Sequence, residues 1–321
     1  MSRVIRWGLI GAGDIARKRV AAALRDSANS ALTAVSRARP ELAESFATSV
    51  GADRWHTRWE DLVADPGIDA VYVATPVHVH ALHAIGAAEA GKHVLCEKPM
   101  AMNVAECDRM IAACRANGVR LGIAYYRHFY PVVQRIQQLL ASGAIGDPVF
   151  IQMDAFERFN PQPGEPRYWF VQRAVSGGGP MFDFGCHRLE LLLMLCGPVR
   201  QVKGLTANVI FKREVEDTAV AVMQFERGVC ATLAVTHAAS EPRDTFRIFG
   251  TNGSIHVPVL NAGELTIVSN GVERTESHAA PANLHQPLVQ DFVEALLEGR
   301  APGVTGEVGR AVAEIEAAVY S

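Results

Sequence analysis

Short apolar runs alternate with segments of helical spacing from the start of the chain to about residue 125. The apolar runs predict buried strands over 4–10, 32–35, 70–74, 93–96 and 119–124. The segments between them predict helices over 15–24, 40–51, 79–90 and 103–118. Buried strands that alternate with helices are typical of a parallel sheet covered on both faces.

The pattern changes after about residue 148, where apolar and polar residues alternate one by one. This alternation predicts half-buried strands over 202–211, 218–225, 229–236, 245–249, 254–259 and 265–268. Asn252-Gly253 and Asn270-Gly271 are hairpin signals, and helical spacing returns over 180–195, 284–297 and 307–319. We therefore expect two domains, 1–124 with a parallel sheet and 125–321 with a mainly antiparallel α+β structure.

Composition and charge narrow the class of protein. The chain has 321 residues, of which 49% are hydrophobic and 20% charged, with a formal net charge of -3, so nothing attracts it generally to nucleic acid or anionic membrane. The first seven residues do not resemble a signal peptide, and the most apolar window, 189–196, is too short to span a bilayer. Six cysteines without a C-x-x-C motif suit a reducing compartment. We expect a cytoplasmic protein.

A glycine-rich turn follows the first predicted strand and opens the first predicted helix. Its sequence, Gly11-Ala12-Gly13-Asp14-Ile15-Ala16, matches the dinucleotide fingerprint G-x-G-x-x-G/A. Gly11 permits the tight turn, Gly13 lets the backbone approach a pyrophosphate, and Ala16 lets the helix pack close to the strand. This context predicts a nicotinamide dinucleotide cofactor, contacted by Gly11, Gly13, Asp14, Ile15 and Ala16.

The end of the second predicted strand distinguishes the two nicotinamide dinucleotides. An acidic residue there binds the ribose hydroxyl of NAD, but this chain has Ser36, Arg37 and Arg39 instead. A hydroxyl and two guanidinium groups suit a ribose phosphate, which predicts that NADP is preferred. The alternative is NAD, with Arg37 and Arg39 as solvated charges and Glu41 or a water at the ribose.

Two further segments carry candidate chemistry. Glu97-Lys98-Pro99 directly follows a strand of the parallel sheet, where side chains face the ligand crevice. Downstream, a run of three glycines at 177–179 suits a backbone that approaches a ligand closely, and it leads into a helix on which Asp183 and His187 share a face. Taken alone, each of these side chains has an equally good structural explanation as an ion pair, a dipole partner or a buried histidine.

The motifs occur in a specific order: G-A-G-D-I-A at 11–16, A-V-Y-V-A-T-P-V-H-V-H at 70–80, G-K-H-V-L-C-E-K-P at 91–99 and G-G-G-P-M-F-D-F-G-C-H at 177–187. Over nearly the whole chain this resembles the glucose-fructose oxidoreductase/inositol dehydrogenase/rhizopine catabolism (Gfo/Idh/MocA) family. The resemblance implies an α/β fold with an N-terminal Rossmann domain and a C-terminal α+β domain. It also implies that an open-faced, mainly antiparallel sheet in that second domain forms homo-oligomers, as dimers or tetramers.

The resemblance also assigns residues. Lys98, Asp183 and His187 match the family's catalytic trio, and the cofactor loop and its neighbours match Thr75, Pro76, His80, Glu97, Lys98 and Arg127. Tyr126 lies in the segment that reaches the nicotinamide region and is a substrate candidate. The order Arg167-Tyr168-Trp169 reverses the family's W-R segment, so Arg167, Trp169 and Arg173 are all candidates for the substrate side.

We therefore predict an NAD(P)-dependent dehydrogenase or reductase that transfers hydride to or from a carbinol or carbonyl carbon of a sugar, polyol or related diol. His187 or Lys98 exchanges the proton. Two alternatives within the fold are a cofactor-assisted glycoside hydrolase and a non-catalytic regulator that senses the dinucleotide. The histidines at 78, 80, 83 and 93 with Cys96 suggest a metal, but two of them lie in the cofactor loop, so we assign no metal site.

Overall fold

The computed structural model describes residues 3–321, which divide into two compact units. The first unit extends to Tyr126 and includes Ala282–Ala313, and the second comprises Arg127–Pro281 and Glu314–Ser321. The expected division at 124/125 was drawn from sequence pattern. The structure adds that a segment close to the C-terminus packs with the first unit.

The first unit is built on a six-stranded parallel sheet in the order β3-β2-β1-β4-β5-β6. Its strands are β1 (Ile5–Ile10), β2 (Ser30–Ser36), β3 (Arg54–His56), β4 (Ala70–Val73), β5 (His93–Cys96) and β6 (Leu121–Ile123). Its helices are η1 (Ala16–Val20), α1 (Ala21–Asp26), α2 (Pro40–Val50), α3 (Trp59–Ala64), η2 (Val77–Val79), α4 (His80–Glu89), α5 (Val104–Ala116) and α9 (Gln286–Glu298). This strand order is that of a dinucleotide-binding Rossmann fold, so the predicted fold class is confirmed.

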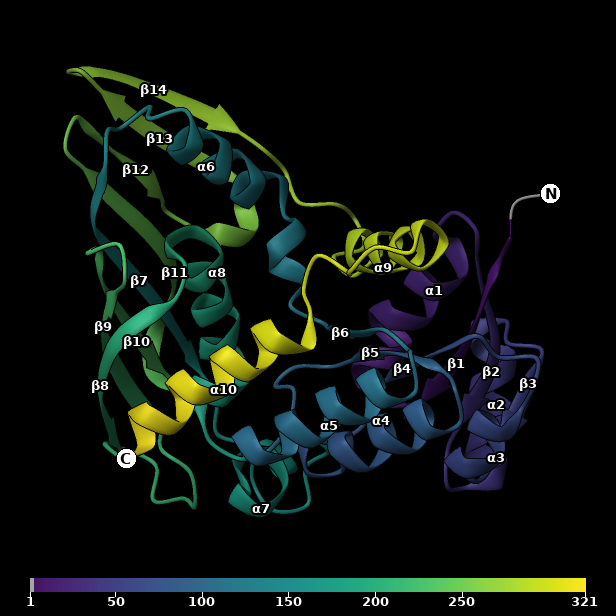
Figure 1. Ribbon diagram of the computed structural model, residues 1–321. Helices are drawn as coiled ribbons and strands as arrows, with labels where there is room; N and C mark the ends of the chain where they lie inside the picture. Colours follow the sequence, from purple (N-terminus) through teal and green to yellow (C-terminus); the bar gives the residue numbers. More distant parts are fainter. Residues whose placement is uncertain (1–2) are drawn as a thin grey trace. The chain divides into compact units, whose positions relative to one another are not determined.

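Helices cover both faces of this sheet. Figure 1 shows α4 and α5 on one face and α1 and α9 on the other. Phe292 of α9 packs on Trp7 of β1, with ring centroids 5.6 Å apart, and both side chains are buried. The late segment 282–313 therefore completes the hydrophobic core of the N-terminal unit.

The second unit is built on an eight-stranded sheet in the order β14-β13-β12-β11-β7-β10-β9-β8, in which only β7 and β10 pair in parallel. Its strands are β7 (Pro148–Arg158), β8 (Val199–Ala207), β9 (Thr218–Phe225), β10 (Cys230–Thr236), β11 (Ala238–Gly250), β12 (Gly253–Val257), β13 (Glu264–Ser269) and β14 (Val272–Ser277). Its helices are α6 (Pro131–Ala141), η4 (Tyr168–Val171), α7 (Arg173–Ser176), η5 (Met181–Gly185), α8 (Cys186–Cys196) and η6 (Leu260–Ala262). The remaining helices, η3 (Tyr126–Phe129) and α10 (Gly306–Tyr320), cross the division between the units.

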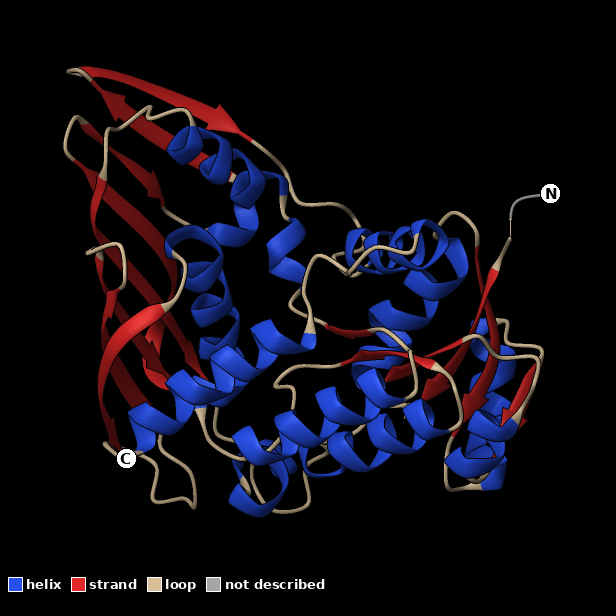
Figure 2. Cartoon of the chain, in the orientation of Figure 1, coloured by secondary structure: helices blue, strands red, loops and turns tan. Residues whose placement is uncertain are grey.

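Helices α6 and α8 of the second unit lie on one face of its sheet (Figure 2). The side chains on that face, such as Ile151, Met153 and Leu233, are fully buried. Alternate positions point the other way and include the exposed Val220 and Val222 of β9. The expected mainly antiparallel, open-faced sheet is confirmed.

Most predicted elements are present, and the differences have local causes. The strand expected over 202–211 ends at Ala207, because the carboxylate of Asp217 accepts hydrogen bonds from the backbone N–H groups of Val209, Ile210 and Phe211 and draws the chain out of the sheet. Strand β7 and helix α6 were not predicted. In β7 apolar residues such as Phe150 occupy the outward positions as well as the inward ones, which hides the alternation.

Candidate functional site

The glycine turn after β1 has the geometry of a dinucleotide-binding turn. Gly11 has φ +96°, and a Cβ there would lie 2.7 Å from the carbonyl oxygen of Ala74, so only glycine fits. A Cβ at Gly13 would meet no atom within 4 Å, which leaves open space above the exposed turn. Ala16 is fully buried where η1 begins. These residues fit a bound nicotinamide dinucleotide.

The carboxyl end of β2 lies beside this turn. The Gly11 N–H donates to the carbonyl oxygen of Ser36 over 3.2 Å, and the Arg37 N–H donates to the carbonyl oxygen of His56 over 3.1 Å. Ser36 is buried, Arg37 is half-buried, and the exposed Arg39 occupies the position before α2 without a capping hydrogen bond from its side chain. Arg37 and Arg39 therefore come directly after the end of β2, which is hydrogen bonded to the glycine turn at Gly11.

The loop after β4 is held by two histidines of the helix that follows it, α4. Both ring nitrogens of His80 are hydrogen bonded to backbone carbonyls, Nδ1 to Pro99 at 2.9 Å and Nε2 to Thr75 at 2.8 Å. His83 Nδ1 lies 3.1 Å from the Thr75 hydroxyl. The ring of His80 thus has no nitrogen available to a metal, which is a physical reason against the metal interpretation of these histidines.

The turn that carries Lys98 rests on a buried carboxylate. Glu97 accepts hydrogen bonds from the Tyr72 hydroxyl at 2.7 Å, from His285 Nε2 at 3.3 Å and from the Lys98 backbone N–H at 3.2 Å. Burial alone would raise the pKa of Glu97, but His285 and the Lys98 charge outweigh it and hold the pKa below its usual value. Glu97 thus fixes the Lys98 turn, and the Lys98–Pro99 peptide bond is cis.

Tyr72 and His285 were missed by the sequence reasoning. Tyr72 reads as one more apolar residue of a buried strand, and His285 lies 188 residues from Glu97 along the chain. Tyr126, a substrate candidate, packs its ring on His285 with centroids 4.6 Å apart. Arg127, a cofactor candidate, is buried at the start of the second unit.

The three predicted catalytic residues are divided between the units. Lys98 belongs to the first unit, whereas Asp183 and His187 belong to the second.

In the second unit, Asp183 and His187 lie on one continuous helical segment whose first turn is irregular. Asp183 lies in η5, a π-helical turn, and the buried His187 lies in the α-helical part, α8. A π turn is wider than an α turn, and such turns recur at functional sites. The two residues come from the same helical segment, as predicted.

The glycine run before η5 has a different explanation from the one expected. A Cβ at Gly178 would lie 2.4 Å from the Tyr320 hydroxyl, and one at Gly179 would lie 2.1 Å from the Glu216 carbonyl oxygen. A Cβ at Gly177 would meet the Phe182 ring at 2.7 Å. Protein atoms therefore occupy the space that the missing side chains leave. The expectation that these glycines make room for a ligand is replaced by close packing within the unit.

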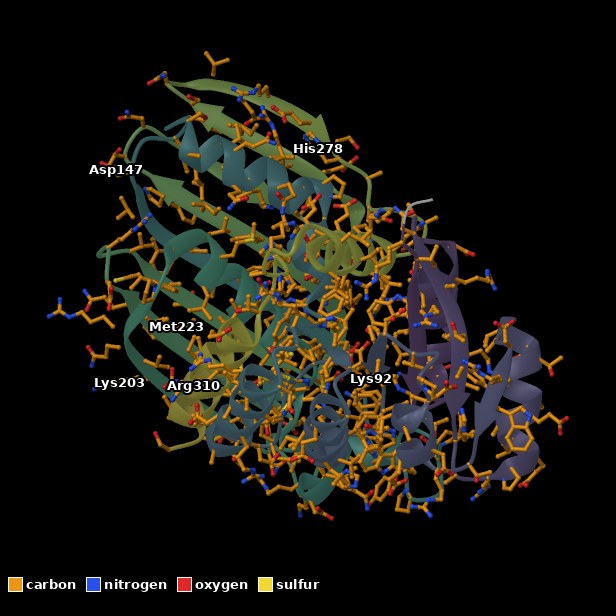
Figure 3. All side chains as sticks on the ribbon, turned by 45° about the vertical axis from the view of Figure 1, so that its right-hand side comes forward. Lys92, Asp147, Lys203, Met223, His278 and Arg310 are labelled. Carbon is orange, nitrogen blue, oxygen red and sulfur yellow. The ribbon has the colours of Figure 1, made fainter. Side chains whose placement is uncertain are left out.

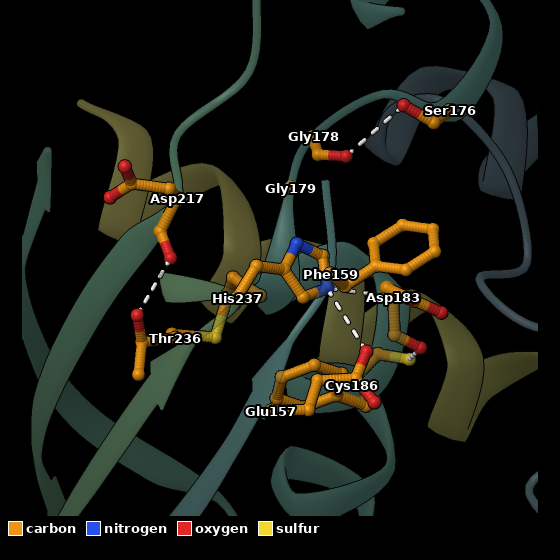
Figure 4. Close-up of polar contacts among 12 residues, drawn as sticks. Glu157, Phe159, Ser176, Gly178, Gly179, Asp183, Cys186, Asp217, Thr236 and His237 are labelled. Atoms are coloured by element: carbon orange, nitrogen blue, oxygen red, sulfur yellow. Dashed lines mark hydrogen bonds and ion pairs between the residues drawn. The ribbon is translucent and has the colours of Figure 1, made fainter. Parts of the chain in front are cut away.

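The ionisable side chains of Glu157, Asp183 and His237 lie close together (Figure 4). His237 Nε2 lies 3.5 Å from an oxygen of Asp183 and 3.6 Å from an oxygen of Glu157. His237 is fully buried, whereas the Glu157 side chain is 46% exposed, so the cluster is open to solvent on the Glu157 side. Burial and the nearby charge of Asp183 raise the pKa of Glu157 above its usual value. Sequence reasoning gave no signal for Glu157.

The two candidate arginines differ in their surroundings. Arg167 lies over the Phe159 ring at 4.4 Å, and that ring packs against His237 with centroids 5.0 Å apart. Arg173 donates instead to the backbone carbonyl of Glu214 at 3.0 Å. Of these two arginines, Arg167 is therefore the one near the Asp183 cluster. Trp169 stacks on Phe170 in the same short segment, with centroids 3.8 Å apart.

Comparison with known proteins agrees with these two units. A model described as an oxidoreductase family with an NAD-binding Rossmann fold matches residues 5–125, and a Gfo/Idh/MocA C-terminal domain model matches residues 133–256. The chain belongs to the Gfo/Idh/MocA family. The predicted recognition is thereby confirmed, and nicotinamide dinucleotide binding is the property by which the family's N-terminal domain is described.

Relatives within the family match along most of their length. The chain is 30% identical over 309 residues to a 1,5-anhydro-D-fructose reductase of Ensifer adhaerens, covering 95% of this chain and 92% of the relative. It is 31% identical over 272 residues to a trans-1,2-dihydrobenzene-1,2-diol dehydrogenase of Xenopus laevis, covering 84% and 79%. Named relatives of this chain are thus sugar and diol oxidoreductases.

Solved structures of the family agree. A levoglucosan dehydrogenase in complex with NADH and levoglucosan superposes with a TM-score of 0.90 at 25% identity, covering 99% of this chain and 96% of that one. An aldose-aldose oxidoreductase from Caulobacter crescentus gives a TM-score of 0.90 at 27% identity, covering 99% of this chain and 97% of that one.

Within residues 3–321, no helix has the length and apolar character that crossing a bilayer requires.

The buried His83 of α4 predicts acid sensitivity of the first unit. Burial, with the neighbouring His80, lowers the pKa of His83 to about 4. A folded-state pKa below the unfolded value favours the neutral form, so this contribution to stability is complete above about pH 6.5 and is lost as the pH falls toward 4. The variant His83→Asn retains an acceptor for the Thr75 hydroxyl but cannot take up this proton. Between pH 7 and 4.5 we therefore expect the free energy of unfolding to fall by about 2 kcal/mol less in His83→Asn than in the wild type.

Urea unfolding at a series of pH values measures this difference. Leu82→Asn is the matched control, because Leu82 is exposed next to His83 in α4 and the change introduces the same amide without removing a titratable group. Parallel pH profiles for the wild type and His83→Asn would contradict the assignment.

Proposed function

We propose that this protein transfers hydride between a nicotinamide dinucleotide and a carbinol or carbonyl carbon of a sugar, polyol or related diol. One observation carries the proposal: a dinucleotide turn and the Lys98 turn on the first unit occur with Asp183 and His187 on the second, all at the family's motif positions. The sugar and diol oxidoreductases among the relatives support the substrate class.

The roles of the residues follow from their chemistry. The nicotinamide supplies a hydride acceptor or donor when bound. In the oxidative direction the substrate carbon loses hydride and its hydroxyl loses a proton, which passes to His187 or Lys98. Asp183 accepts a hydrogen bond from the substrate hydroxyl and orients it. Glu97 acts through the backbone, since it fixes the turn from which Lys98 extends.

Replacing the proton-transfer candidates tests this proposal. We expect Lys98→Ala and His187→Ala each to lower kcat by about 100-fold to 10,000-fold, with dinucleotide affinity nearly unchanged, because general acid–base catalysis contributes about that much. The assay follows reduced nicotinamide absorbance with NADP and NAD over a panel of sugars, polyols and dihydrodiols. Lys212→Ala, an exposed loop lysine, is the control.

The outcomes separate the alternatives. A Lys98→Ala or His187→Ala enzyme with full turnover would refute the assigned roles. Cleavage of a glycoside without net change in nicotinamide absorbance would favour the hydrolase, and dinucleotide binding without turnover of any substrate would favour the regulator.

We also propose that NADP is the preferred dinucleotide. Arg37 and Arg39 follow the strand end beside the glycine turn, and each offers several N–H donors to a phosphate. We expect Arg37→Ala/Arg39→Ala to raise the KM for NADP by about 10-fold to 100-fold and to leave the KM for NAD unchanged, since a charged hydrogen bond contributes about 1.5–3 kcal/mol. Arg58→Ala, an exposed arginine paired with Glu60, is the control. Equal effects on NADP and NAD would contradict this preference.

The open face of the eight-stranded sheet supports homo-oligomerisation. Leu205 of β8, which is 80% exposed, pairs with Val220 of β9, and Lys203 pairs with Val222, so these four side chains point to one face. Figure 3 labels Lys203 on this face and Met223, which is buried on the other. An exposed apolar patch on a rigid sheet is typical of a protein interface.

Sedimentation velocity tests the interface. We expect the wild type to sediment as a dimer or tetramer and Leu205→Lys/Val222→Lys as a monomer, because two buried charges oppose association. Val272→Lys, at an exposed hairpin end, is the control and stays oligomeric. A monomeric wild type, or an oligomeric double variant, would overturn this proposal.

A further inference from the structure

His237 is held rigidly at the end of β10. Its backbone N–H donates to the carbonyl oxygen of Asp217 at 2.8 Å, and its carbonyl oxygen accepts from the Phe159 N–H at 2.9 Å. The imidazole is fully buried and packs edge-on against the rings of Phe159 and Phe184, with centroids 5.0 and 5.2 Å away. The ring orientation seen in Figure 4 is therefore set by its surroundings.

Arg213 determines which nitrogen of His237 carries a proton. One guanidinium nitrogen of Arg213 lies 2.8 Å from His237 Nδ1, and the same guanidinium donates to the carbonyl oxygens of Phe159 and Glu216, each at 2.9 Å. Arginine has N–H donors and no acceptor, so Nδ1 must accept and is unprotonated. The proton of the neutral imidazole is then on Nε2.

The Nε2–H group faces two carboxylates. Nε2 lies 3.5 Å from an oxygen of Asp183 and 3.6 Å from an oxygen of Glu157, and it has no hydrogen-bond partner within the described chain. The other charged groups that act on Glu157 are Arg167 and Arg188, which oppose the rise in its pKa. A buried N–H at these distances orients the carboxylates electrostatically.

We propose that Arg213 and His237 are positioning residues for Asp183: Arg213 holds His237 as the neutral Nε2–H tautomer, and this N–H directs the Asp183 carboxylate toward the substrate hydroxyl. The proposal rests on the role given to Asp183 in the proposed function. It extends that function to two residues outside the family motif segments.

The same geometry argues against a metal at this cluster. Glu157, Asp183 and His237 bring ligand atoms within 4.8 Å of one another, a spacing that suits a metal ion. A histidine binds a metal through an unprotonated nitrogen, however, and the one unprotonated nitrogen of His237 is occupied by Arg213. The Nε2 proton occupies the position that a metal would need.

Nitrogen NMR of ¹⁵N-histidine-labelled protein tests the tautomer directly. We expect the signals of the neutral His237 ring, assigned by their loss in His237→Gln, to show a protonated Nε2 and an unprotonated Nδ1. In Arg213→Met the donor to Nδ1 is removed, so we expect the signals of the Nδ1–H tautomer to appear beside those of the Nε2–H tautomer. An Nδ1–H tautomer in the wild type, or a shift of Nε2 on adding Zn²⁺ or Mg²⁺, would overturn the proposal. This experiment needs no activity, so it stands whether or not the proposed function holds.

Kinetics tests the link to Asp183. In His237→Gln the amide nitrogen reaches the place of Nε2, whereas in His237→Asn it reaches only that of Nδ1. We expect His237→Asn to lower kcat by about 10-fold to 100-fold, as for a misplaced catalytic group, with unchanged dinucleotide affinity, and His237→Gln to recover most of the loss. Equal losses in the two variants would mean that His237 contributes packing alone. Wild-type protein that shows the Nε2–H tautomer but no turnover would refute the dehydrogenase and leave the tautomer assignment intact.

Discussion

Two consecutive buried carboxylates, Glu216 and Asp217, hold together the part of the second unit that carries Asp183. Glu216 accepts hydrogen bonds from the Gly179 N–H at 2.9 Å and from the Tyr320 hydroxyl at 2.5 Å. Burial would raise the pKa of Asp217, but hydrogen bonds from three backbone N–H groups hold it below its usual value. A buried carboxylate destabilises a fold unless its oxygens accept hydrogen bonds. The hydrogen bonds to Glu216 and Asp217 therefore hold the glycine run, Tyr320 and the loop after β8 in place.

The first unit also contains a buried carboxylate that accepts several hydrogen bonds. Glu97 is buried, and its oxygens are satisfied by Tyr72 of β4, by His285 before α9 and by the backbone of Lys98. The turn that presents Lys98 is therefore fixed by hydrogen bonds to the buried Glu97 carboxylate. In both units the side chain proposed to react extends from backbone that a neighbouring buried carboxylate immobilises, which is the arrangement that preorganised catalysis requires.

The parts of the site that sequence reasoning predicted are those encoded within a short stretch of chain. Gly11 could be read as a tight turn because its neighbours on both sides show the strand and the helix that it joins. Gly178 and Gly179 could not be read in the same way. Their Cβ positions are filled by Tyr320 and Glu216, which come from far along the chain, and no local pattern distinguishes such packing from room for a ligand. Strand β7 was missed for a related reason, since apolar residues on both faces hide its period.

The residues that contact the proposed catalytic segments are separated from them in sequence. His285 reaches Glu97 across 188 residues, and Arg213 reaches His237 across 24. A motif scan detects Glu97 and Asp183 but not His285, His237 or Arg213. A chain can therefore keep every family motif and still lack the side chains that contact those motifs. In this protein the motif residues and their distant partners occur together. That joint presence, which appears only in three dimensions, is a stronger argument for an intact catalytic site than the motifs are by themselves.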